Sequence, residues 1–332
     1  MRVEKLHSNL HSSYNAFLES MPTMLYYSLP FKNLLEDFLQ CDSHYVVALE
    51  GDKIRGILPL MSKNGLYGEV LNSLPFYGSN GGIIAENADA YFVLREYYNS
   101  FASTFASANY IQNPLIAESG GISHDFIDKR LSQWTKLMDK DSLFASFAPS
   151  ARRNIKKALR ENIKVTTTRE IDFLYQTHRE NILANNGIPK EKIFFEKIAK
   201  YFSDREYKIY MAFYNDKPIA ALLLFYFRGI VEYYTPATLV EFRDLQALPL
   251  LIYAAMVEAY ECGFEWWNWG GTWESQESLY KFKEKFGGAE KCYNYYCKLN
   301  NQEILNAKAS ELLREYPYFY VVPFDRLRKN EI

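Results

Sequence analysis

Apolar residues form short runs of strand length in both halves of the chain, separated by polar turns. Residues 44–50 and 54–61 flank Gly51-Asp52, and residues 207–214 and 219–227 flank a second polar turn. Each pair is typical of a β-hairpin, because a tight turn with Gly, Asn or Asp suits two antiparallel strands. We therefore predict one hairpin in each half of the chain.

The same order of elements follows in both halves. Within residues 44–116 and 207–299, the pattern predicts a hairpin, a third strand, a helix and a further strand. The chain has 332 residues, which is comfortable for two domains. We predict an α/β (α+β) fold of two similar units with mixed central sheets flanked by helices. The expected domains are 1–145 and 146–316, with 317–332 packing back on the first.

One stretch of the second half, residues 264–288, combines several unusual features. It opens with an aromatic run at 264–269 and then breaks at Gly270-Gly271, where the backbone can approach another backbone or a ligand closely. A helix is predicted at 274–286, closed by Gly287-Gly288 as a C-cap. We expect this stretch to organise the second unit.

Lys283 is the exception on one face of that predicted helix. Leu279, Phe282 and Phe286 share its stripe by their spacing. One interpretation is a lysine whose stem covers apolar surface while its ammonium stays in water. The other is a fixed cation in a pocket, placed to meet a developing negative charge. Residue type alone favours the first.

A basic segment at 151–160 follows Pro149-Ser150 and predicts a helix with Ser150 as its N-cap. Such a run is usually a solvated face. It is also the only place where an anionic polymer or phosphate is expected to dock. Five cations lie in nine positions of this helix: Arg152, Arg153, Lys156, Lys157 and Arg160.

Charge, cysteine content and apolar runs limit the function classes. The net charge is −2, whereas a dedicated nucleic-acid binder is usually basic, so we expect no DNA partner. The four cysteines show neither CxxC spacing nor a nearby histidine at metal-ligand spacing, so we expect free, buried thiols and no metal site. No signal peptide or membrane-spanning run is apparent, and we expect a soluble, cytoplasmic protein.

A glycine-rich loop at 76–82 is a further candidate for close approach to a ligand. It contains Tyr77, Gly78 and Asn80 among its seven residues. By composition it is at least as well explained as a turn between two elements.

Several motifs together resemble the FemABX-like peptidyltransferases, which belong to the GNAT superfamily of N-acyltransferases. In the second half these are SxRRNIxKA from Ser150, WNWGG from Trp267 and FKxxFGG from Phe282. In the first half, the 75–82 loop and DxRxxQxxxL from Asp128 are similar to the family's first domain. The resemblance extends over nearly the whole chain through the order and spacing of these motifs.

The resemblance implies two tandem GNAT-like domains, the second of them catalytic, and transfer of an amino acid from aminoacyl-tRNA to an amine of a peptidoglycan precursor, or a related acylation. It implies that Lys283, with Phe282 beside it, stabilises the tetrahedral intermediate, and this reverses the preference stated above. It also implies a phosphate contact at Arg179.

Aminolysis of an ester needs proton handling and stabilisation of an oxyanion. Glu232, Tyr233 and Tyr234 lie on a predicted central strand and are the candidates for moving the proton. The alternative is that the tyrosines pack in the sheet and Glu232 faces solvent. The expected catalytic residues are Lys283, Phe282, Glu232 and Tyr234. The expected substrate-binding residues are Arg179, Tyr77, Gly78, Asn80, Trp269, Gly270, Gly271 and Arg243, and the expected tRNA or phosphate contacts are Arg152, Arg153, Lys156 and Lys157.

The segment before the predicted helix at 249–262 bears on the donor. A CoA-dependent GNAT protein cradles pyrophosphate with glycine-rich backbone N–H groups at a helix N-terminus. Residues 243–249 hold no glycine, and Pro249 lacks an N–H donor. We therefore expect no bound cofactor and aminoacyl-tRNA as donor, with acyl-CoA the less favoured donor.

Three interpretations stay open at this point. The first is a tRNA-dependent acyltransferase acting on a cell-wall or sugar-nucleotide precursor, with peripheral membrane contact through any lipid-linked substrate. The second is an acyltransferase of the same fold that uses a thioester donor on a surface-polysaccharide amino sugar or a small amine. The third is a non-catalytic binding module, which intact Phe282-Lys283 and Gly270-Gly271 disfavour.

Overall fold

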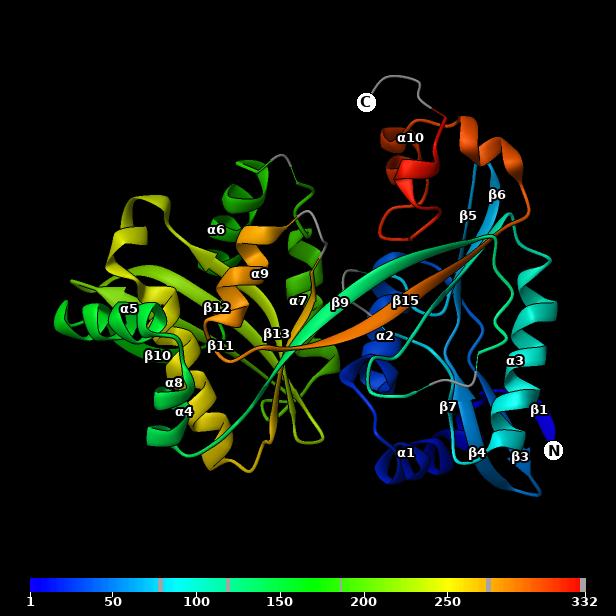
Figure 1. The fold of residues 1–332 in the computed structure, drawn as a ribbon, viewed down its shortest axis with the longest axis horizontal. Helices are drawn as coiled ribbons and strands as arrows, with labels where there is room; N and C mark the ends of the chain where they lie inside the picture. Colours follow the sequence, from blue (N-terminus) through cyan, green and yellow to red (C-terminus); the bar gives the residue numbers. More distant parts are fainter. Residues whose placement is uncertain (77–79, 118–119, 186, 273–275, 329–332) are drawn as a thin grey trace. The chain divides into compact units, whose positions relative to one another are not determined.

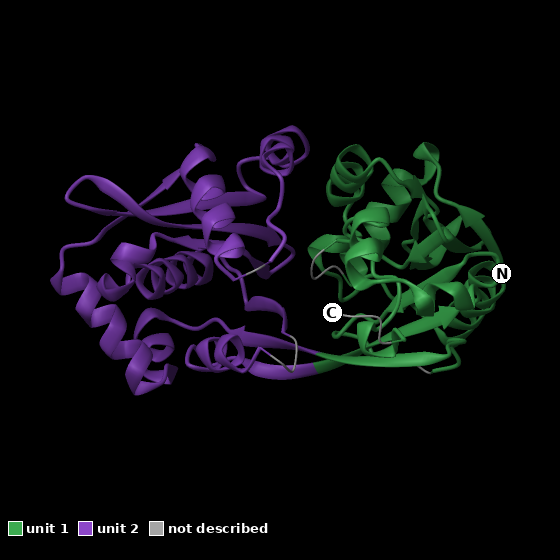
Figure 2. Ribbon diagram, turned by 90° about the horizontal axis from the view of Figure 1, so that it is seen from above, with its two compact units in different colours: residues 1–130, 292–332 green, residues 131–291 purple. Residues whose placement is uncertain are grey.

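The computed structural model describes residues 1–76, 80–117, 120–185, 187–272 and 276–328. The chain forms two compact units, drawn in separate colours in Figure 2. Unit 1 comprises residues 1–130 and 292–332, and unit 2 comprises residues 131–291. The chain passes between them inside two strands, β9 (Phe126–Lys136) and β15 (Ala289–Leu299). The domain boundaries expected from the sequence stay a prediction.

Unit 1 contains a four-stranded sheet in the order β1-β3-β4-β7 (Figure 1). The predicted hairpin is confirmed, because β3 pairs with β4 from Val46↔Leu58 to Glu50↔Lys53. The elements of this part are β1 (Arg2–Lys5), β3 (Val46–Glu50), β4 (Lys53–Leu58), β7 (Ile84–Ala85), α1 (His11–Ser20), α2 (Leu29–Leu39) and α3 (Ala88–Ala102).

The other strands of unit 1 follow the order β15-β8-β6-β5-β2 and belong to an 11-stranded sheet. The strand expected at 54–61 is in fact divided, since β4 ends at Leu58 and a second hairpin begins at Met61. Several hydrogen bonds bind the C-terminal segment to these strands; for example, Tyr316 Oη donates to Gly68 O at 2.7 Å, and Asn72 Nδ2 donates to Tyr320 O at 2.8 Å. The elements are β2 (Asp42–Ser43), β5 (Met61–Gly65), β6 (Gly68–Asn72), β8 (Ser107–Ile111) and α10 (Ala309–Glu315).

Unit 2 is built on strands in the order β10-β11-β12-β13-β14-β9. Neighbouring strands are antiparallel except β13 and β14, which are parallel. The bounds are β10 (Lys164–Thr168), β11 (Tyr207–Tyr214), β12 (Lys217–Phe227), β13 (Ile230–Thr238) and β14 (Trp266–Thr272). The predicted second hairpin is confirmed as β11 and β12.

Helices cover both faces of the unit 2 sheet (Figure 1). Residues Tyr233, Trp267 and Trp269 pack in the cluster formed with α4, α5 and α8. The opposite face meets α6 and α7, where Phe194 stacks on Tyr234. The helices are α4 (Lys140–Ser146), α5 (Pro149–Arg160), α6 (Asp172–Leu183), α7 (Lys192–Tyr201), α8 (Ala247–Glu261) and α9 (Glu277–Glu284). Short 3-10 turns lie at Ser8–Leu10, Leu25–Tyr27, Val240–Leu245, Gln302–Asn306 and Phe324–Arg326.

Two local predictions are wrong. Ser150 is not the N-cap of α5, because the helix begins at Pro149 and Ala148 holds the cap position without a side-chain bond. Proline suits the first helical turn, since its fixed φ is helical and its missing N–H is not needed there. Helix α9 ends at Glu284 rather than 286, and the predicted start at 274 lies outside the described residues.

The four cysteines are free, as expected, but they are not all buried. Cys297 is buried, Cys41 is half-buried, and Cys262 and Cys292 are exposed. Among the described residues, no helix combines the length and apolar character needed to cross a membrane.

Candidate active site

The site lies where the parallel strands β13 and β14 stop pairing. Their ladder runs only from Ile230↔Trp266 to Glu232↔Asn268, although both strands continue beyond it. On the other side of β14, the register with β9 shifts between Asn268 and Gly271. Gly270 has φ +71°, a left-handed conformation that glycine adopts without strain. Backbone N–H and C=O groups of β14 near Gly270 can therefore form hydrogen bonds with side chains instead of with a neighbouring strand.

Lys283 places its ammonium group at this irregular part of β14. Its side chain is only 3% exposed, although α9 otherwise faces solvent. Its Nζ donates to Thr272 Oγ1 at 2.7 Å, to Gly271 O at 3.2 Å and to Gly270 O at 3.3 Å. These three acceptors match the three donors of an ammonium group. Lys283 is thus a fixed, buried cation site rather than a lysine that extends into water.

Burial also changes the ionisation of Lys283. Desolvation disfavours the charged form of an amine, and it lowers the pKa of Lys283 to about 7. A group with this pKa can hold or release a proton near neutral pH. The site can therefore present an ammonium to a developing negative charge in a medium of low dielectric constant.

Glu232 lies on β13 directly opposite Asn268 on β14. It is 1% exposed, so the interpretation of a solvent-facing glutamate does not apply. Asn268 Nδ2 donates to Glu232 Oε2 at 2.8 Å, and Gly270 N donates to Asn268 Oδ1 at 2.9 Å. Since Gly270 O accepts from Lys283 Nζ, a chain of hydrogen bonds through Asn268 and Gly270 connects the glutamate with the lysine.

The two candidate tyrosines have different surroundings. The register of β13 shifts so that Tyr234 has no partner on β12, between Tyr233↔Leu224 and Thr235↔Leu223. Tyr234 shares the α6/α7 face with Glu232, and burial, followed by the charge of Glu232, raises the pKa of Tyr234 well above its ordinary value. Tyr234 is therefore a neutral hydroxyl. Tyr233 packs against Trp269 on the opposite face, with a centroid distance of 4.9 Å.

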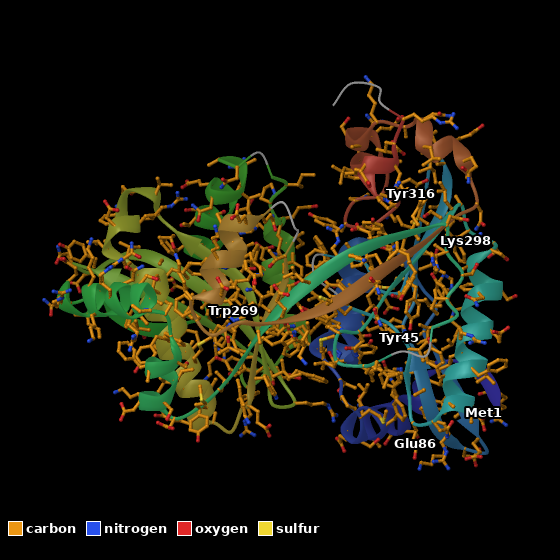
Figure 3. All side chains as sticks on the ribbon, viewed as in Figure 1. Met1, Tyr45, Glu86, Trp269, Lys298 and Tyr316 are labelled. Carbon is orange, nitrogen blue, oxygen red and sulfur yellow. The ribbon has the colours of Figure 1, made fainter. Side chains whose placement is uncertain are left out.

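The aromatic residues of the stretch support the site by packing. Trp269 is 2% exposed and lies inside unit 2, as Figure 3 marks. Its indole N–H donates to Thr135 Oγ1 at 2.9 Å. Phe286 and the half-buried Phe282 pack on its ring, at 5.5 Å and 6.4 Å between centroids. This arrangement favours a packing role for Trp269 and places α9 with Lys283 directed inward.

The remaining expected residues lie apart from this group or outside the description. Arg179 on α6 and Arg243 are exposed. Asn80, in unit 1, is buried and its Nδ2 donates to Gln112 O at 3.0 Å. Tyr77 and Gly78 lie outside the described residues. The roles expected for these residues stay predictions.

The basic helix α5 presents its cations to solvent. Arg153, Lys156, Lys157 and Arg160 are exposed, and Arg152 is half-buried. None of the five forms an ion pair with a carboxylate in the part of the chain that the structure describes. Ala151, Ile155 and Ala158 anchor the other side of the helix. The charge of this face is therefore available to an anionic ligand.

Sequence reasoning missed two members of the site, Asn268 and Thr272. The sequence did contain a signal for Asn268, because successive residues of a strand face opposite sides of the sheet. If Trp267 and Trp269 enter one core, the asparagine between them must face the other side with Glu232. Nothing in the sequence indicated Thr272 as the acceptor of Lys283. Among the described residues, no group of His, Cys, Asp or Glu could hold a metal ion.

Comparison with known proteins agrees with this architecture. Residues 146–284 match the family model described as an acetyltransferase (GNAT) domain. The crystal structure of FemX superposes with a TM-score of 0.70 at 14% identity, covering 92% of this chain and 98% of that one. The chain has a FemABX-like tandem GNAT fold. The fold class predicted from the sequence is thus confirmed, as is the resemblance to FemABX-like proteins at the level of fold.

Two further solved structures share the FemABX-like fold. The C-terminal domain of a putative lysylphosphatidylglycerol synthetase from Agrobacterium fabrum has a TM-score of 0.56 at 12% identity, covering 95% of this chain and 99% of that one. A tandem GNAT protein from the clavulanic acid biosynthesis pathway has a TM-score of 0.52 at 12% identity, covering 89% and 97%. No curated protein matches the chain by sequence. The likeness to these solved structures shows the fold, and the matched family model lies within unit 2.

Proposed function

We propose that the protein is an N-acyltransferase that moves an aminoacyl group from aminoacyl-tRNA to an amine of a cell-envelope precursor, such as a peptidoglycan precursor. The observation that carries the proposal is the buried Lys283 ammonium, held at Gly270-Gly271 where β13 and β14 stop pairing. A fixed cation in a dry site stabilises an oxyanion far more than the same charge in water does.

The reaction assigns one task to each group. The acceptor amine attacks the ester carbonyl carbon of the donor, a C–N bond forms, and the carbonyl oxygen becomes an oxyanion beside Lys283. Glu232 takes the proton that the nitrogen loses. The C–O bond then breaks, and the leaving ribose oxygen receives that proton. The neutral hydroxyl of Tyr234 lies on the same face as Glu232 and can donate a hydrogen bond during the transfer.

The entry to α8 favours tRNA over CoA as the donor. Gln246 occupies the N-cap in a left-handed conformation with φ +60°, and Ala247 and Pro249 are buried in the first turn. A pyrophosphate cradle needs successive exposed N–H groups at this place, and Pro249 has none. The exposed cations of α5 instead offer a site for a polyanion.

Binding of tRNA to α5 should depend on salt. We expect Arg153→Ala with Lys157→Ala to weaken tRNA binding about tenfold or more at low salt, and to reduce the slope of log K against log salt by about 1–2, because each phosphate contact releases condensed counterions. Calorimetric titration with charged tRNA, and separately with acetyl-CoA, at two salt concentrations measures both effects.

The matched control is Lys192→Ala with Lys281→Ala, because these cations already contact Asp172 and Glu277. It should leave tRNA affinity near that of the wild type. Tight acetyl-CoA binding without tRNA binding would reject the tRNA donor and support the thioester alternative. That alternative has support of its own in the acetyltransferase description of the matched domain.

Glu232→Gln is expected to lower kcat by about 100-fold, because a general base contributes roughly 10²–10⁴-fold and the amide cannot accept the proton. The side chain keeps its size, so KM should change little. Steady-state rates of aminoacyl transfer measure the effect. Glu258→Gln is the control, since that carboxylate contacts Lys208 and Tyr210 instead. Equal rates for both variants would show that Glu232 does not handle the proton.

A further inference from the structure

We propose that Asn268 is a positioning residue that links Glu232 to the backbone carbonyls that hold Lys283. The inference rests on the proposed function for its catalytic meaning, but the link itself is a property of unit 2. Asn268 lies between two core tryptophans and is 2% exposed, so its amide reaches only protein groups near this point of the sheet.

The first step is that both ends of the Asn268 side chain are fixed. A backbone N–H can only donate, so the atom that meets Gly270 N must be the amide oxygen. The amide nitrogen must then be the atom that donates to Glu232 Oε2, at 2.8 Å. No other neutral side chain of this length offers one donor and one acceptor in this arrangement. Aspartate keeps the contact to Gly270 but loses the donation to Glu232.

The second step is that Gly270 transmits the position of Asn268 to Lys283. Gly270 is held by its N–H on Asn268, and its carbonyl accepts from Lys283 Nζ at 3.3 Å. Its left-handed φ of +71° turns the backbone at the position where the β14–β9 register shifts. Without the Asn268 oxygen, the half-buried Gly270 N–H would lose this acceptor, a cost that favours rearrangement of the turn.

The third step concerns the ionisable groups around this link. On the α6/α7 face, Tyr234 lies two residues beyond Glu232, and the Lys190 ammonium lies 5.1 Å from the Tyr234 ring centroid. Burial lowers the pKa of Lys190 to about 8, and burial followed by the charge of Lys190 lowers the pKa of His178 to about 3. Burial is also the cause of the lowered pKa of Lys283. Access of water to the carbonyl oxygens of Gly270 and Gly271, which hold its ammonium, should therefore govern its ionisation.

The test is the ionisation of Lys283 in variants of Asn268. In Asn268→Leu the turn should loosen and admit water to Lys283, and we expect its pKa to rise by one unit or more from about 7. Lysine-selective ¹³C and ¹⁵N labelling with NMR titration measures this in the full chain without substrate.

The matched control is Asn181→Leu. Asn181 likewise bonds the backbone of β13 with both ends of its amide, at Thr238 N and Thr238 O, but it lies outside the link. It reports what loss of a half-buried asparagine that bonds the backbone does to unit 2 in general. If Asn268→Leu shifts the Lys283 pKa no more than Asn181→Leu does, the proposal is overturned and Asn268 is a structural residue.

Catalysis gives a second, separable readout. In the transfer assay, Asn268→Leu should lower kcat about tenfold, a factor that corresponds to a modest misplacement of catalytic groups, with KM within about threefold of the wild type. A shifted Lys283 pKa together with no activity from any donor would retain the link and reject the proposed function. Transfer activity with an unshifted pKa and unchanged kcat in Asn268→Leu would retain the function and reject the link.

Discussion

Replacing Lys283 by methionine is expected to lower kcat for aminoacyl transfer by about 10²–10³-fold, the range found when one oxyanion-stabilising donor is removed. Methionine has a similar length and an apolar stem, so it fills the space of the lysine stem near Gly270 and Thr272. The ammonium acts on charge that develops only in the transition state, and KM should therefore stay within about threefold. Single-turnover and steady-state transfer rates measure both quantities.

The control for this prediction lies on the same helix. Lys281 is exposed, and its Nζ donates to Glu277 Oε1 at 2.5 Å one turn away. Lys281→Met removes a cation of α9 without touching Gly270 or Thr272, and its kcat should equal that of the wild type. A folded Lys283→Met variant with wild-type kcat would reject the oxyanion role. Loss of binding with kcat retained would indicate that Lys283 holds substrate equally in the ground state and the transition state.

The sequence predicted the architecture better than it predicted the site. Hairpins such as β11–β12 depend on local alternation and turn residues, which are visible in any sequence. The position of Lys283 on an apolar stripe was visible too. Its direction was not, because a stripe does not say whether an ammonium ends in water or on backbone carbonyls of another element. That depends on the irregular turn at Gly270, which only the register of β14 with β9 reveals.

The burial of Glu232 could not be predicted from local sequence patterns either. Its position on a central strand could be predicted, but its burial could not, because a glutamate on a strand more often faces solvent. The reason for its burial lies in a partner distant in sequence: Asn268, on the parallel strand, satisfies one carboxylate oxygen. Contacts between parallel strands depend on a crossover, here through α8, and local patterns do not encode their register. Asn268 was therefore missed although its own direction could be derived.

The second large effect is on stability. We expect the free energy of unfolding of the wild type, minus that of Lys283→Met, to rise by about 4 kcal/mol between pH 7 and pH 10, because one pKa unit corresponds to about 1.36 kcal/mol. The pKa of Lys283 is lowered to about 7 in the folded chain, whereas an unfolded lysine keeps its ordinary value. Between these values the unfolded state holds a proton that the folded state lacks, so stability rises with pH. Below pH 7 both states hold the proton, and the difference should be constant.

Urea unfolding of both variants across this pH range measures the effect, with thermal denaturation as a second method. Taking the difference removes the contributions of the buried tyrosines, whose ionisation both variants share. Lys281→Met reports the effect of losing a surface cation of α9 alone. A difference that is flat from pH 7 to pH 10 would mean that Lys283 keeps an ordinary pKa and remains an ammonium throughout. The oxyanion role could then survive, but Lys283 would not be the group that limits transfer above neutral pH. If the rise is found together with a loss of kcat above pH 7, the same proton governs stability and catalysis.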